Sequence, residues 1–117
     1  MPRLHSPTPI SRRQLREHDR LADVLEDMRF AQKLRQPGRA VGGMEAVLLR
    51  RLMADLARFM SREPGGRALL RLPAGGPLDP ETVAAALLDA EIALTAFKRA
   101  HQDSEEDCCW VMLEDAF

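Results

Sequence analysis

Apolar residues recur at intervals of three and four positions in three segments of this sequence, and that spacing places them on one face of an α-helix. The first segment carries a stripe formed by Leu21, Val24, Leu25, Met28, Ala31 and Leu34. The second segment, residues 44–62, is apolar around most of its circumference, which is typical of a helix covered on two sides. The third segment carries a seam formed by Val83, Leu87, Ala90, Leu94 and Phe97. The pattern therefore predicts three helices.

Capping and turn residues indicate where these helices begin and end. Ser11 is a favoured N-cap, and Gln14 completes a capping box, so the first helix is predicted over residues 11–35. A glycine pair precedes the second helix, predicted over residues 44–62. Asp79 as N-cap, with Pro80 in the first helical position, predicts a third helix over residues 80–101.

Three helices of this length predict an all-α fold, a small three-helix antiparallel bundle formed by residues 11–101 of a single domain. Residues 1–10 contain Pro2, Pro7 and Pro9, which lack a backbone donor, so we expect an extended N-terminal arm there. Residues 102–117 form an acidic-hydrophobic C-terminal tail. Between the second and third helices, residues 67–72 are compatible with a short strand or with an apolar turn.

Composition narrows the class of protein. The chain has 117 residues, 45% of them hydrophobic and 30% charged, which is ordinary for a globular domain and too apolar for a wholly disordered one. No stretch approaches eighteen uncharged apolar residues, so we expect no membrane association. The two cysteines, Cys108 and Cys109, are adjacent, and their Cα atoms lie too close for an ordinary disulfide. This favours a reducing, cytoplasmic location.

Charge is divided unevenly along the chain. Residues 1–63 carry thirteen basic and eight acidic side chains, whereas residues 64–117 carry four and ten. Two interpretations stay open at this point. Either the basic half presents a face to an acidic partner, or the two halves attract one another within the fold.

A basic patch lies at the start of the first helix, formed by Arg12, Arg13, Arg16 and Arg20. Arg12 and Arg13 occupy the first turn, where the helix dipole favours acidic side chains. Such a conflict with local preference suggests either a solvated cluster or a site that grips phosphates. A nucleic-acid-binding regulator is therefore the alternative functional hypothesis, although the link over residues 36–43 is too long for a tight helix-turn-helix.

Catalytic and metal-binding patterns are weak. The three histidines are far apart in the sequence, and their spacing with the cysteines matches no zinc pattern. No serine lies in a nucleophile-elbow pattern. We expect His101 to face solvent near a helix C-terminus and His18 to be a half-buried structural residue. The sequence thus indicates a protein that is not an enzyme, with no cofactor and no metal.

The apolar surface favours contact with another protein. The second helix and the tail carry more apolar side chains than one small bundle is expected to hide, which is typical of contact sites. The candidate contact residues are Leu49, Met53, Met60, Trp110, Met112, Leu113 and Phe117. The leading hypothesis is a non-enzymatic helical interaction module, namely an adaptor, a chaperone or a small subunit, whose partner is another protein or a second copy. The tail has three possible roles: folding back on the basic patch, docking on another subunit, or completing its own core.

Overall fold

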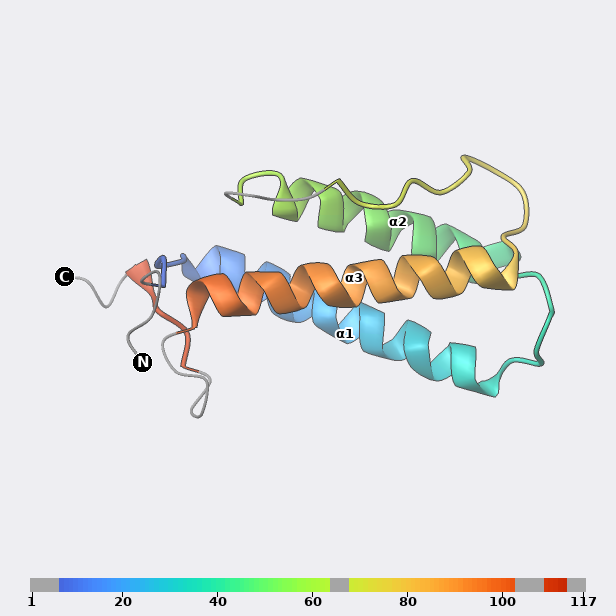
Figure 1. The fold of residues 1–117 in the computed structure, drawn as a ribbon, viewed down its shortest axis with the longest axis horizontal. Helices are drawn as coiled ribbons and strands as arrows, with labels where there is room; N and C mark the ends of the chain where they lie inside the picture. Colours follow the sequence, from blue (N-terminus) through green and yellow to red (C-terminus); the bar gives the residue numbers. More distant parts are fainter. Residues whose placement is uncertain (1–6, 64–67, 103–108, 114–117) are drawn as a thin grey trace.

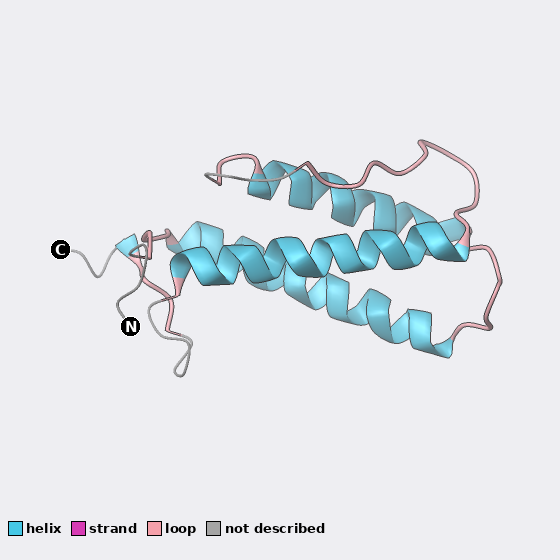
Figure 2. Ribbon diagram, viewed as in Figure 1, coloured by secondary structure: helices cyan, strands magenta, loops and turns pink. Residues whose placement is uncertain are grey.

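A computed structural model describes residues 7–63, 68–102 and 109–113 and contains three helices (Figure 1). They are α1 (Arg12–Leu34), α2 (Gly43–Met60) and α3 (Pro80–His101). Each helix packs against the other two. The described residues outside the helices form loops and isolated bridges rather than strands (Figure 2). The predicted all-α three-helix bundle is confirmed.

The helices begin where the capping residues predicted. Gln14 donates its backbone N–H to Ser11 Oγ at 3.1 Å, and Ser11 donates its backbone N–H to Gln14 Oε1 at 3.0 Å, which is a complete capping box. Asp79 occupies the N-cap position of α3, but its side chain makes no capping bond within the described part of the chain. Pro80 supplies the preset backbone angle of the first turn instead.

The helices differ in direction. α1 runs antiparallel to both of its neighbours, whereas α2 and α3 run in the same direction (Figure 1). Val41 and Leu78, which precede these two helices, exchange backbone hydrogen bonds of 2.7 Å at one end of the bundle. Glu63 and His101 meet at the other end. The predicted antiparallel arrangement therefore holds for the two helix pairs that include α1. α2 and α3 are parallel because the long connection between them returns along α2, so both helices begin at the same end of the bundle.

This returning connection is fixed to the helices at several points. Arg50 donates from Nε to the carbonyl of Pro73 at 2.7 Å and from Nη2 to the carbonyl of Gly76 at 2.6 Å. Asp89 Oδ2, on α3, accepts a hydrogen bond of 2.8 Å from the backbone N–H of Leu70. Residues 68–72 belong to neither a strand nor a turn and follow an irregular path along the helices. The loop therefore acts as a cover over one flank of α2.

The arm and the tail close one end of the bundle. The backbone N–H of Thr8 donates to the carbonyl of Ala100 at 3.0 Å, and that of Ile10 donates to the carbonyl of Val111 at 2.9 Å. Leu113 donates its backbone N–H back to the Ile10 carbonyl at 2.8 Å. Ile10 is fully buried as a result. The acidic part of the tail, residues 103–107, lies outside the described residues, as does the beginning of the arm.

Candidate protein-contact surface

Three of the predicted contact residues are core residues. Leu49, Met53 and Met60 are at most 6% exposed, and all three belong to the apolar core between the helices. Met53 and Met60 also face the returning loop, which lines a groove with them through residues 68–74. Their assignment to a contact surface is therefore corrected. The long connection covers the flank of α2 that the sequence pattern left open.

The predicted contact residues in the tail divide between core and surface. Trp110 and Met112 are half-buried and pack against the core, whereas Leu113 is 43% exposed. Gln102 and Trp110 form an isolated bridge. Phe117 lies outside the described residues. The core-completing role thus describes Trp110 and Met112. Among the described tail residues 109–113, only Leu113 presents a large apolar area to solvent.

A cluster of rings fills the same end of the bundle. Phe97 is 1% exposed, and its ring centroid lies 4.6 Å from that of Phe59, 5.6 Å from that of His18 and 5.8 Å from that of Trp110. The His18 ring stacks on Phe97 and meets Trp110 edge-on at 4.8 Å. His18 was expected to be half-buried, but it is 3% exposed because Trp110 folds over it. This cluster joins α1, α2, α3 and the tail.

His101 is buried, contrary to the sequence expectation. It is 3% exposed, and its Nδ1 lies 2.5 Å from the carbonyl oxygen of Thr8. Its Nε2 lies 2.7 Å from Glu63 Oε1, whose side chain is 9% exposed. The expected position in solvent is wrong because the arm and the end of α2 both cover the C-terminus of α3. The histidine connects three segments that are distant in the sequence.

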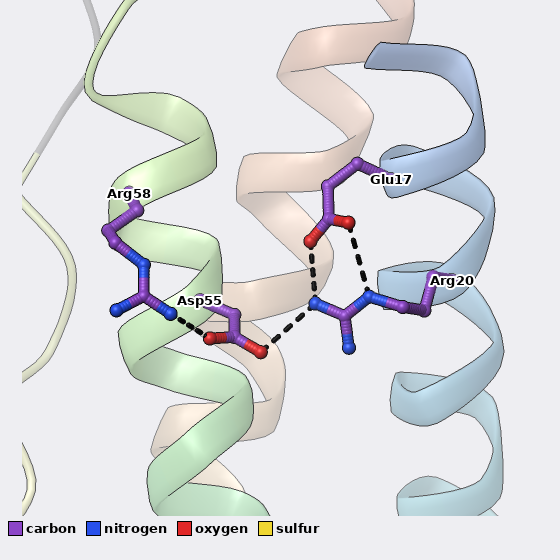
Figure 3. A network of polar contacts seen from close by, with 4 residues as sticks. All are labelled: Glu17, Arg20, Asp55 and Arg58. Carbon is purple, nitrogen blue, oxygen red and sulfur yellow. Dashed lines mark hydrogen bonds and ion pairs between the residues drawn. The ribbon is translucent and has the colours of Figure 1, made fainter. Parts of the chain in front are cut away.

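The basic patch is exposed, and part of it is already paired. Arg12, Arg13, Arg16 and Arg20 all lie at the surface of α1. Figure 3 shows Arg20 between two carboxylates: its guanidinium donates to Glu17 at 2.5 and 3.2 Å and to Asp55 of α2 at 3.0 Å. These hydrogen bonds, the one to Glu17 foremost, raise the pKa of Arg20. Asp55 also accepts from Arg58, so this network joins α1 to α2.

Part of the exposed apolar surface lies on another element, the outer face of α3. Leu88 is 58% exposed and Ile92 is 42% exposed. Between Glu81 and Lys98, the most exposed residues of α3 are uncharged, and we call them the α3 strip: Ala84, Ala85, Leu88, Ile92, Thr95 and Ala96. Glu91, which pairs with Arg29, lies beside the strip with its side chain about half exposed. The strip covers more than three helical turns. An uncharged strip of this length on a surface helix is unusual, since such faces normally carry charged residues.

Exposed apolar residues border the α3 strip on both sides. Phe30 of α1 is 64% exposed and lines a groove between α1 and α3 together with Thr95. Leu70 of the returning loop is 39% exposed and lines a second groove with Leu88 and Ile92. The strip therefore has an exposed apolar side chain on each side, and the groove toward α1 also carries charged side chains, among them Lys33 and Glu91. One signal in the sequence pointed to it, namely the small residues Ala84 and Ala85, which allow a neighbouring helix to approach closely.

A smaller apolar group lies at the beginning of α2. Met44, Val47 and Leu48 are 70%, 52% and 42% exposed, and they share one face of the helix. This face becomes charged within one turn, at Arg51. The group is thus shorter than the α3 strip, and it lies on the flank of α2 opposite to the buried Leu49 and Met53.

Comparison with known proteins adds no relative: no family model, no known protein and no solved structure matches this chain. Within the described ranges, no three histidine, cysteine, aspartate or glutamate side chains gather in a way that holds a metal ion. Among the same residues, we find no helix with the length and hydropathy needed to cross a membrane. The exposed surfaces of the bundle are therefore the features from which a function is inferred.

Proposed function

We propose that this chain is a non-enzymatic helical interaction module, and that its contact surface is the α3 strip. The observation that carries the proposal is the exposure of Leu88 and Ile92 at the centre of an uncharged face. The bundle completes its own core with the returning loop and the tail, so the exposed halves of these two side chains are not needed for the fold of the chain itself. Leu88 and Ile92 form the docking surface through which this chain acts as an adaptor, a chaperone or a small subunit.

The strip has the size and chemistry of a binding centre. Burying a large aliphatic side chain contributes about 1.5–3 kcal/mol, and Leu88 and Ile92 are each about half exposed. The bordering Phe30 and Leu70 add apolar area, while Glu91 pairs with Arg29 beside the strip. A central apolar group within a polar border is the usual arrangement of a protein interface.

Photo-cross-linking in the native cell tests this function. A photoreactive amino acid in place of Leu88 is expected to yield a discrete cross-linked protein species, because this position faces the partner. The matched control carries the same amino acid in place of Asp23, an exposed residue of α1. Equal labelling at both positions, or no product at position 88, would contradict the proposal.

A second candidate function, nucleic-acid binding, is favoured by one observation. Arg13, Arg20, Arg58 and Arg62 line a single groove of about 720 Å³ between α1 and α2. Arginine side chains in a groove bind phosphates in a salt-dependent manner. We expect any such binding to weaken steeply with added salt and in a variant with Arg13, Arg58 and Arg62 of this groove changed to serine. If no gel shift occurs at low ionic strength, this candidate is rejected.

A further inference from the structure

We infer that the partner of the α3 strip is a second copy of this chain, with the two α3 helices packed antiparallel about a two-fold axis at the level of Ala90. This inference rests on the proposed function and names the partner of the same surface. A two-fold contact requires a surface that is complementary to itself after reversal. The α3 strip meets that condition in both its shape and its charge.

The charges at the two ends of the strip have the required positions. Glu81 and Arg99 are eighteen residues apart, which is five full turns at 3.6 residues per turn, so they lie on one line along the helix. Both side chains are exposed, and no ion pair within the described part of the chain holds either of them. In an antiparallel pair centred at Ala90, Glu81 of each copy lies opposite Arg99 of the other.

The uncharged residues of the strip follow the same symmetry. Leu88 and Ile92 lie two positions on either side of Ala90, so each leucine meets the isoleucine of the other copy. Beyond them, Ala84 and Ala85 lie at the same levels along the helix as Ala96 and Thr95 of the other copy, respectively. These small side chains allow the two helix axes to approach within about 8–10 Å. The large side chains thus meet at the centre, and small side chains surround them.

The residues that border the strip enlarge the contact. The two-fold rotation places the same border of both copies at the same edge of the contact. The Leu70 segments of both copies therefore flank one edge, and the two Phe30 side chains flank the other. A pair of helices alone buries less than a standard interface of about 1,600 Å². The exposed Phe30 and Leu70 extend the buried area toward that size. We therefore expect a dimer that dissociates on dilution.

Other occupants fit these observations less well. An unrelated helix would bury Leu88 and Ile92 equally well, but it would not require opposite charges at equal distances from the centre of the strip. The described part of this chain's own tail, residues 109–113, contacts Ile10 and the ring cluster instead. The charge arrangement is thus what favours a second copy.

Charge reversal tests the inference in the full chain. By sedimentation velocity from about 10 μM to about 1 mM, the wild type is expected to reach twice its 13.1 kDa mass. Glu81→Arg and Arg99→Glu each place like charges together at both ends, so each variant is expected to associate on the order of 30-fold more weakly. An equimolar mixture of the two variants pairs opposite charges again and is expected to restore association, as is the double variant Glu81→Arg/Arg99→Glu.

Each result of this experiment has a defined meaning. Circular dichroism shows whether the exposed substitutions leave the helices intact. A wild type that stays at 13.1 kDa at every concentration, or a mixture that associates no better than its components, overturns the inference. If the chain is a monomer but position 88 still cross-links to a different protein, the proposed function stands and the second copy is excluded. If neither association nor cross-linking occurs, both fail.

Discussion

Replacing Phe97 by alanine is expected to lower the free energy of unfolding by about 3–5 kcal/mol, because it removes the ring that joins all three helices and the tail. Phe97 is 1% exposed, and it contacts the rings of Phe59, His18, His101 and Trp110. The loss approaches the whole stability of an ordinary domain. Tryptophan fluorescence of Trp110 reports the unfolding directly.

Urea titration at a fixed protein concentration measures this loss. Val47→Ala is the matched control, since Val47 is 52% exposed and its truncation is expected to change stability by less than about 0.5 kcal/mol. If Phe97→Ala is unfolded without urea, the milder Phe97→Leu is expected to lose roughly 1–2 kcal/mol. A Phe97→Ala protein as stable as the control would show that the ring cluster does not hold the bundle together.

The second large effect is expected from His101→Leu, at about 3 kcal/mol or more. His101 bonds to the Glu63 carboxylate and to the Thr8 carbonyl in the buried end of the bundle. The leucine leaves Glu63, which is 9% exposed, buried without its partner. An unpaired buried carboxylate costs more than the pair contributes, so most of the loss is desolvation.

The double variant His101→Leu/Glu63→Leu separates this effect from simple loss of packing. Removing both partners also removes the unpaired charge, so the double variant is expected to recover a large part of the loss in urea titrations. Glu63→Leu alone completes the cycle. Additive losses in the two single variants would contradict the account, because they would show that the two side chains do not interact.

The sequence predicted the helices well because their signals are local. The capping box of Ser11 and Gln14 depends on residues three positions apart, and the apolar stripes depend on a period of 3.6. The predicted ends of all three helices lie within two residues of those in the structure. Pro80 marked the start of α3 in the same way.

Capping residues and apolar periodicity do not predict which segments distant in the sequence pack together. α2 has apolar residues on two flanks, and periodicity alone does not say which flank a distant loop will cover. The loop covers Met53 and Met60, so the exposed group is Met44, Val47 and Leu48 instead. His101 is buried for a similar reason, since its cover comes from Thr8 and Glu63, far away in the sequence.

The sequence pattern did not single out the α3 strip, because the strongest apolar runs lie elsewhere in the chain. Half of the strip's residues are alanines, and its two large members, Leu88 and Ile92, lie beside a more regular seam that forms the core. A helix with apolar residues on opposite faces has one face for its own core and one for a partner. Once the core face of α3 is known, the exposed uncharged residues of the helix define the α3 strip. Their positions on either side of Ala90 then show its symmetry.

The central claim is that the bundle closes its own core and leaves the α3 strip to join two copies. An isotope-filtered NOE experiment on a mixture of differently labelled chains tests it most directly, at a concentration where the dimer predominates. The account predicts contacts between the methyl groups of Leu88 in one copy and Ile92 in the other. Intermolecular contacts confined to Leu49, Met53 or Met60, or their complete absence, would contradict it.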